Sequence, residues 1–162
     1  MKKRWLALYV ENNVGILAKI SGLFAGKNYN LDSLTVGTTN DATVSRMTIG
    51  LTGDDALFEQ IKKQLNRCIG IIKVIDLTDR NIEVKELLFI KVFNCTAAEK
   101  TGLFQIAGAF HATVSDCGKN DVLLELCAPS SRNDEVILLM KQYRELEIVR
   151  SGAVAIERGC GI

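Results

Sequence analysis

The sequence lacks most of the features that indicate an enzyme, a membrane protein or a nucleic-acid-binding protein. Its 162 residues include one histidine, His111, and no P-loop, nucleophile elbow or H-E-x-x-H zinc motif. No apolar run approaches the roughly 20 residues that a membrane-spanning helix needs. The formal net charge of +1 gives no electrostatic reason to expect nucleic acid or a membrane as a partner. We therefore expect neither partner, and no catalytic or metal-binding residue is assigned.

The cysteine pattern argues against a disulfide framework and against a metal site. The five cysteines are odd in number and widely spaced, and no C-x-x-C pair occurs. Most have apolar neighbours, among which a free thiol behaves as a small hydrophobic group. No signal-peptide core follows the basic first residues, so we expect a cytoplasmic protein. The cysteines are Cys68, Cys95, Cys117, Cys127 and Cys160.

Hydrophobic periodicity predicts the element order βαββαβ in the first half of the chain. Two amphipathic helices are expected, over 14–27 and 54–67, because apolar residues recur there every three or four positions. This is the ferredoxin-like order, in which two helices cover one face of a four-stranded antiparallel sheet. The predicted strands, rich in β-branched residues or alternating in pattern, are 4–10, 32–39, 43–52 and 70–77.

The second half repeats this plan, so the predicted fold class is α+β with two ferredoxin-like domains in tandem. The domains are expected at 1–78 and 84–160, joined by a linker over 78–84. Each half is small for independent stability, and an open sheet leaves two edges to protect, so we expect a homodimer. The elements expected in the second half are strands at 86–93, 111–117, 122–127 and 148–157, and helices at 101–110 and 132–144.

RNA-recognition domains share the βαββαβ order and are the first alternative to test. They need aromatic residues on their central strands and a basic surround. The strand expected over 43–52 carries no aromatic residue, and the characteristic K/R-G-F/Y-G/A-F-V pattern is absent. The sequence therefore disfavours RNA binding.

The turn between the first strand and the first helix is the best candidate for a ligand site. The chain there reads Asn12-Asn13-Val14-Gly15, and Asn30 follows fifteen positions after the glycine. First-turn N–H groups of a helix have no intrahelical partner and attract a carboxylate or phosphate. A glycine lets a ligand approach the backbone closely, and amides that both donate and accept suit a zwitterion. The alternative interpretation is a helix cap without a ligand.

Several blocks of sequence resemble the small regulatory subunit of acetohydroxyacid synthase, also called acetolactate synthase. The resemblance is strong over 11–77 and looser over 85–158, and segment 93–102 departs from the family pattern. The matching blocks are VENNVGIL at 10–17, GLF at 22–24, NYNLDSLTV at 28–36, SRMTI at 45–49, KQL at 63–65, VIDL at 74–77, KEL at 85–87 and RSG at 150–152.

The resemblance implies a regulatory protein whose first half is an ACT domain. Such a subunit is not catalytic by itself. It binds the large, thiamine-diphosphate-dependent catalytic subunit, activates it and confers feedback inhibition by valine in branched-chain amino acid (valine and isoleucine) biosynthesis. It has no cofactor of its own, because thiamine diphosphate, Mg and FAD belong to the catalytic subunit. The alternative is a stand-alone ACT-type amino-acid sensor that controls another protein.

The resemblance also implies a valine site between the ACT domains of two subunits. By position, the family's ligand-contacting residues correspond to Asn12, Gly15 and Asn30. We expect Asn12 and Asn30, one from each subunit, to bind the carboxylate and the ammonium group of valine. Neighbouring residues would supply N–H groups and an apolar wall for the isopropyl group. The predicted effector-binding residues are thus Asn12, Val14, Gly15, Ile16, Leu17 and Asn30.

Overall fold

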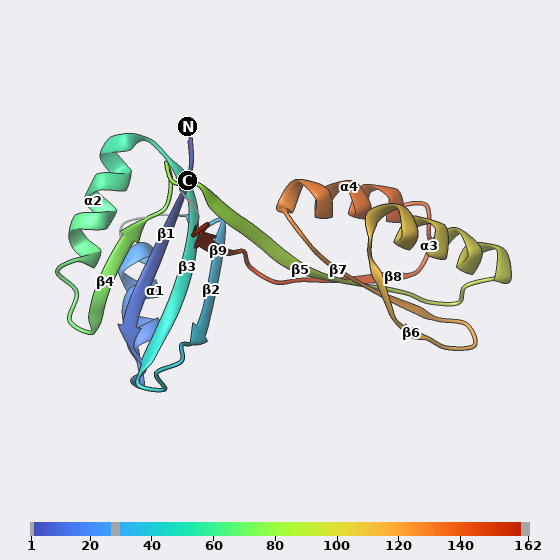
Figure 1. Cartoon of the computed structure of the whole chain (residues 1–162), viewed down its shortest axis with the longest axis horizontal. Coiled ribbons are helices and arrows are strands. Elements are labelled where there is room, and N and C mark those ends of the chain that lie inside the picture. Colours follow the sequence, from blue (N-terminus) through green and yellow to red (C-terminus); the bar gives the residue numbers. More distant parts are fainter. Residues whose placement is uncertain (1, 27–29, 160–162) are drawn as a thin grey trace. The chain divides into compact units, whose positions relative to one another are not determined.

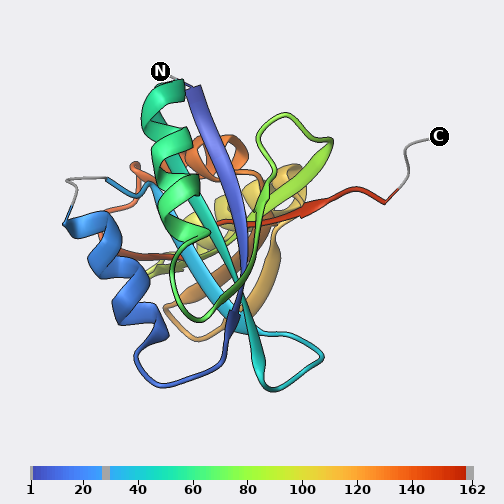
Figure 2. The same cartoon turned by 90° about the vertical axis from the view of Figure 1, so that its left-hand side faces the viewer.

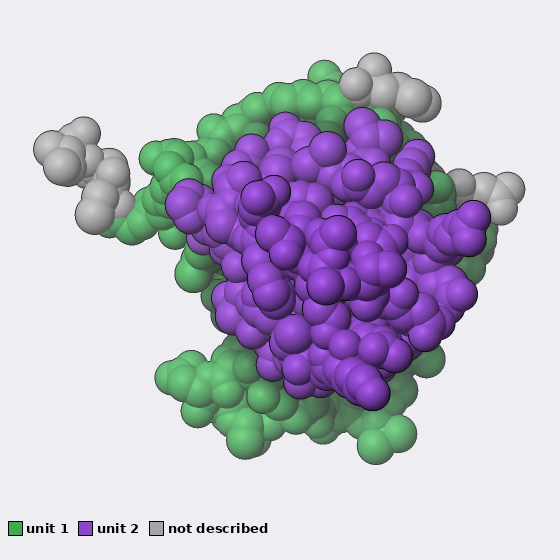
Figure 3. Space-filling view, turned by 90° about the vertical axis from the view of Figure 1, so that its right-hand side faces the viewer, with its two compact units in different colours: residues 1–83, 153–162 green, residues 84–152 purple. Residues whose placement is uncertain are grey.

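The computed structural model describes residues 2–26 and 30–159, and the chain forms two compact units. The first unit comprises Met1–Glu83 together with Ala153–Ile162, and the second comprises Val84–Gly152 (Figure 3). Both units pack helices on an antiparallel sheet, so the predicted α+β class with two ferredoxin-like units is confirmed. The chain crosses between the units twice, because residues 153–159 return to the first unit.

The first unit contains a four-stranded sheet in the order β2-β3-β1-β4. Strands β1 and β3 pair over ten consecutive positions, from Lys2 opposite Gly53 to Glu11 opposite Val44. Figure 2 shows the two helices on the near face of this sheet. The elements are β1 (Lys2–Glu11), α1 (Ile16–Ala25), β2 (Ser33–Thr38), β3 (Val44–Gly53), α2 (Asp55–Leu65) and β4 (Ile71–Asp76) (Figure 1).

The core of the first unit lies between the sheet and its helices. Alternate residues of β1 point into it, since successive side chains of a strand face opposite sides of the sheet. The side chains of Leu6, Leu8 and Val10 are fully buried there against Ile20 and Phe24 of α1. The intervening residues of β1 lie on the other face of the sheet.

The second unit has its sheet in the order β6-β7-β5-β8, with α3 and α4 on one face (Figure 1). Strand β5 begins in the first unit, continues into the second, and also pairs with β9. The elements are β5 (Ile82–Val92), α3 (Ala97–Phe110), β6 (Thr113–Cys117), β7 (Val122–Ala128), α4 (Ser130–Met140), β8 (Leu146–Arg150) and β9 (Val154–Glu157).

Several boundaries predicted from residue 78 onward are wrong. The helix expected over 101–110 begins at Ala97, because Thr96 and Glu99 form a capping box. The helix expected over 132–144 begins at Ser130, directly after Pro129, and ends at Met140. The linker expected over 78–84 is partly strand, since β5 begins at Ile82. The strand expected over 148–157 is two strands, β8 and β9, interrupted at residues 151–153.

The segment that contains β9 covers part of the sheet face opposite α1 and α2. The alanines Ala153 and Ala155 are fully buried, and side chains of β2 and β3 bond to their backbone groups. Ala153 N–H donates to Ser33 Oγ (2.7 Å), Thr35 Oγ1 donates to the Ala153 carbonyl (2.8 Å), Ala155 N–H donates to Thr48 Oγ1 (3.5 Å), and Arg46 Nη2 donates to the Ala155 carbonyl (2.6 Å).

Because Ala155 has no exposed surface, a larger side chain at this position should disrupt the packing of the tail. We expect Ala155→Leu to lower the free energy of unfolding by about 1–3 kcal/mol. The matched control is Val154→Leu, since Val154 is 54% exposed, and it should change stability by about 0.5 kcal/mol or less. Urea unfolding can be followed by fluorescence of Trp5, the only tryptophan in the chain. Equal midpoints for the two variants would contradict this packing.

Candidate functional site

The turn between β1 and α1 ends at a glycine in the left-handed region of backbone space. Gly15 has φ +88° and is the N-cap of α1, and no side chain caps the helix. A Cβ atom added at Gly15 would meet nothing within 4 Å. The position therefore favours glycine because of its backbone angle, which an L side chain adopts only with strain, and not for lack of space.

The missing cap leaves backbone donors available at the start of α1. The N–H groups of Ile16 and Lys19 donate to the carbonyls of Asn13 (3.3 Å) and Gly15 (2.9 Å). The N–H groups of Leu17 and Ala18 have no acceptor within the described part of the chain. Free donors at the positive end of a helix dipole attract an anionic group such as a carboxylate.

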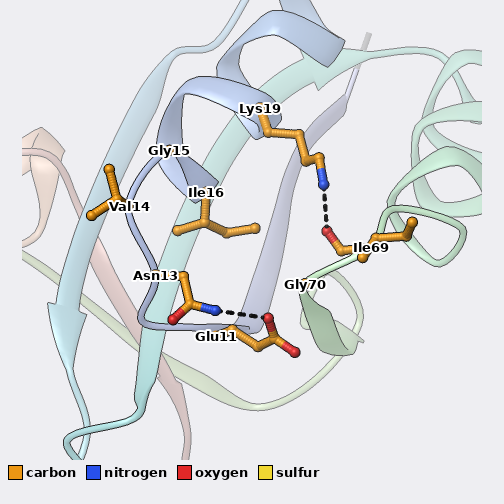
Figure 4. Close-up of a pocket in the computed structure, with 8 residues that line it drawn as sticks. All are labelled: Glu11, Asn13, Val14, Gly15, Ile16, Lys19, Ile69 and Gly70. Carbon is orange, nitrogen blue, oxygen red and sulfur yellow. Dashed lines mark hydrogen bonds between the residues drawn. The ribbon is translucent and has the colours of Figure 1, made fainter.

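A cleft of about 230 Å³ opens beside this helix start (Figure 4). The carboxylate of Glu11 and the ammonium group of Lys19, which carry opposite charges, both lie on this cleft. Asn13 Nδ2 donates to Glu11 Oε2 (3.0 Å), and Lys19 Nζ donates to the carbonyl of Ile69 (3.0 Å). The cleft can therefore present both an acceptor and donors to a polar ligand. Its lining residues are Glu11, Asn13, Val14, Gly15, Ile16, Lys19, Ile69 and Gly70.

Three of the predicted site residues line this cleft, namely Val14, Gly15 and Ile16. The sequence interpretation missed Lys19, although it follows Gly15 by one helical turn, a spacing that places side chains on one face. It also missed Ile69 and Gly70, which are distant in sequence. Gly70 is brought there by pairing, because its carbonyl accepts from the N–H of Glu11 (2.9 Å).

Asn12, in contrast, is bonded to the loop and strand that follow β2. Its backbone N–H donates to the Thr43 carbonyl (2.7 Å) and its Nδ2 donates to the Ala42 carbonyl (2.9 Å). Its Oδ1 accepts from the hydroxyl of Ser45 (3.1 Å). Asn12 therefore does not line the cleft, and its carboxamide is held toward the β2–β3 connection.

Asn30 is exposed and lies at the opposite end of the sheet. Two residues further on, the N–H of Asp32 donates to the carbonyl of Gly50, whereas Asn12 donates to Thr43. Seven residues of an extended strand separate Thr43 from Gly50, which corresponds to about 23 Å. Asn12 and Asn30 of one chain are therefore too far apart to contact the same small molecule.

The remaining predicted residue, Leu17, is 42% exposed and does not line the cleft, and Val14 is fully exposed. Residues 28 and 29, the first two of the NYNLDSLTV block, lie outside the described residues, as do Lys27 and Cys160. The exposed side chains of Val14 and Leu17 leave apolar surface at the turn, which a ligand or a second chain can cover.

Other kinds of site find little support. In the described ranges, no group of three His, Cys, Asp or Glu side chains is placed to hold a metal ion. Burial raises the pKa of the Cys95 thiol, which therefore stays protonated at neutral pH and is a poor nucleophile. Among the helices that are described, none is long and apolar enough to cross a membrane.

Comparison with known families places the first unit in a class of regulatory domains. The family described as the AHAS small subunit-like ACT domain matches residues 6–73. The family described as the small subunit of acetolactate synthase matches residues 85–159. Together the two matches cover nearly all of the described chain.

Individual relatives match over the same extent. The acetolactate synthase small subunit of Bacillus subtilis is 37% identical over 159 residues, which cover 97% of this chain and 91% of the relative. That of Aquifex aeolicus is 36% identical over 162 residues, 100% of this chain and 84% of the relative. The crystal structure of the small subunit from Thermotoga maritima superposes with a TM-score of 0.89, at 29% identity and 98% coverage of both chains.

The chain therefore belongs to the acetolactate synthase small subunit family. Members of this family are regulatory subunits and are not catalytic by themselves. The resemblance read from the sequence blocks is confirmed.

The backbone angle of Gly15 can be tested against a second glycine of the same helix. We expect Gly15→Ala to lower the free energy of unfolding by about 1–2 kcal/mol, because alanine is strained at positive φ. Gly22→Ala should instead raise it by about 0.5–1 kcal/mol, since Gly22 lies inside α1 with open space around it. Thermal and urea unfolding measure both. Changes of the same sign would show that Gly15 is not held in the left-handed region.

Proposed function

We propose that this protein binds and activates the thiamine-diphosphate-dependent catalytic subunit of acetolactate synthase and makes it sensitive to valine. The family membership supports the regulatory role. The observation that carries the effector site is the uncapped start of α1 after the left-handed Gly15, where the N–H groups of Leu17 and Ala18 are free within the described chain. A cytoplasmic location belongs to this proposal, and the free described cysteines are consistent with it.

The wide separation of Asn12 and Asn30 supports a site shared between two copies of the chain. Strand β2 is the edge of its sheet, so one side of its backbone is unpaired among the described residues. In a twofold antiparallel pairing centred on β2, Ser33 of one copy lies opposite Thr38 of the other. Asn30 then approaches position 41 of the second copy, next to the Ala42 that holds Asn12. One copy would supply Asn30, and the other Asn12 and Gly15.

The chemistry of this shared site suits a free amino acid. The α-carboxylate would accept from the N–H groups at the start of α1, and the asparagine amides would bind the carboxylate and the ammonium group. Val14, Ile16 and Leu17 offer apolar surface for the isopropyl group. A pocket of this kind discriminates by only about 1–3 kcal/mol per methylene, so leucine and isoleucine should also bind.

An acidic residue at the helix start should abolish the response to valine. In a reconstituted complex with the catalytic subunit, we expect Gly15→Asp to activate as the parent does but to show no valine inhibition. The introduced charge would occupy the carboxylate position and repel the ligand. Gly22→Asp places the same charge on the same helix, away from its start, and should retain inhibition. Activity titrated with valine, leucine and isoleucine measures both variants.

Mixed dimers can test whether the two asparagines come from different subunits. We expect Asn12→Ala and Asn30→Ala each to weaken valine binding by about 1–3 kcal/mol, since a polar partner is lost. A dimer that contains one subunit of each variant would have one intact site and one doubly altered site. Calorimetry on the mixed dimer should then recover about half the parent's binding stoichiometry. No recovery would place both asparagines in sites formed within one chain.

A further inference from the structure

Beyond the residues already assigned to the site, a buried hydroxyl lies in direct contact with one of them. Ser45 is 5% exposed, and it lies on β3 opposite Val10 of β1. Its hydroxyl donates to Asn12 Oδ1 at 3.1 Å. No other side-chain bond of Ser45 occurs among the described residues.

The direction of this hydrogen bond follows from the neighbouring contact. A backbone carbonyl can only accept, so the bond between Asn12 and the Ala42 carbonyl (2.9 Å) identifies the atom facing Ala42 as Nδ2. The atom facing Ser45 is therefore Oδ1, and the serine hydroxyl must donate to it. With the backbone bond to Thr43, three contacts hold Asn12 on the segment 42–45.

This arrangement leaves the carboxamide with capacity for a ligand. A carboxamide has two N–H donors and an oxygen with two lone pairs. Ala42 and Ser45 each use one of these positions, so one N–H and one lone pair remain. These are the groups that can bind a carboxylate and an ammonium group. We propose that Ser45 is a positioning residue that holds the Asn12 carboxamide in the orientation that binds the effector, an inference that rests on the proposed function.

The neighbouring Asn13 shows what an asparagine at this turn does without such support. Its Nδ2 donates to Glu11 Oε2, and both side chains are exposed. Neither partner is fixed by burial, so this amide is free to exchange its contact for water. The buried Ser45 removes that freedom from Asn12, and less conformational entropy is then lost when a ligand binds.

β3 is also held from its other face. Arg46, the next residue, donates to Thr48 Oγ1 (3.2 Å) and to the Ala155 carbonyl (2.6 Å), and its guanidinium lies 5.9 Å from the centre of the Tyr9 ring. These contacts limit movement of the strand that carries Ser45. The Ser45 hydroxyl therefore keeps its position and holds the Asn12 side chain in one orientation.

The test is the affinity of the full chain for valine, measured by calorimetry, in a double-mutant cycle. We expect Ser45→Ala to weaken binding by about five- to tenfold, the usual loss for one hydrogen bond between neutral groups. Ser45→Thr keeps the donor and should bind like the parent. In an Asn12→Ala background, Ser45→Ala should cause no further loss, because the residue acts only through Asn12.

Thr43→Ala is the matched control. It removes a hydroxyl from the same segment, one that is exposed and donates to Asp41 Oδ1, and affinity should not change. If Ser45→Ala fails to fold, Ser45→Cys preserves the size with a weaker donor and should lose affinity to a smaller extent.

The outcomes separate the two proposals. Parent-like binding by Ser45→Ala, or an equal loss in the Asn12→Ala background, would overturn the role of Ser45 and leave the valine site standing. If the parent protein itself binds no valine, the proposed effector function fails and this inference fails with it.

Discussion

The ten-residue antiparallel pairing of β1 with β3 is the constraint on which the rest of the first unit depends. Its register places the side chains of Leu6, Leu8 and Val10 against the helices. The pairing is followed directly by the hydrogen bond from the Asn12 N–H to the Thr43 carbonyl. Because side chains alternate along a strand, a slip of one residue would turn the core residues outward. The same slip would separate Asn12 from Ser45. Core packing and the geometry of the candidate site are therefore set by one register.

The two faces of β3 serve different purposes. On one face Met47, Ile49 and Leu51 complete the core, and Ser45 continues the same row toward the turn. On the other face the polar side chains of Arg46 and Thr48 bind the backbone of the returning tail. The tail covers a sheet face that otherwise would be open to solvent. Strand β3 thus holds both the β1–α1 turn and the returning segment at Ala155.

The proposed site is incomplete within one chain, and this has a thermodynamic consequence. Asn12 is bonded at Thr43 and the segment after Asn30 at Gly50, about 23 Å apart along β3, so an amino acid bound by both asparagines must bridge two copies. A ligand that contacts two subunits binds better to one arrangement of them than to others. Effector binding and subunit packing are then coupled, which is what a regulatory subunit requires to affect a catalytic partner.

Local patterns in the sequence determined the type and order of the elements. The predicted bounds agree best with the structure in the first unit, where hydrophobic periodicity is clear. They also identified the turn at Gly15, because its unusual backbone angle requires a particular residue type. The tertiary structure alone decided that residues 153–158 return to the first sheet, that Ser45 contacts Asn12, and that Ile69 and Gly70 border the cleft. These contacts join residues more than 30 positions apart, and they depend on strand register and order, which periodicity within a segment does not specify.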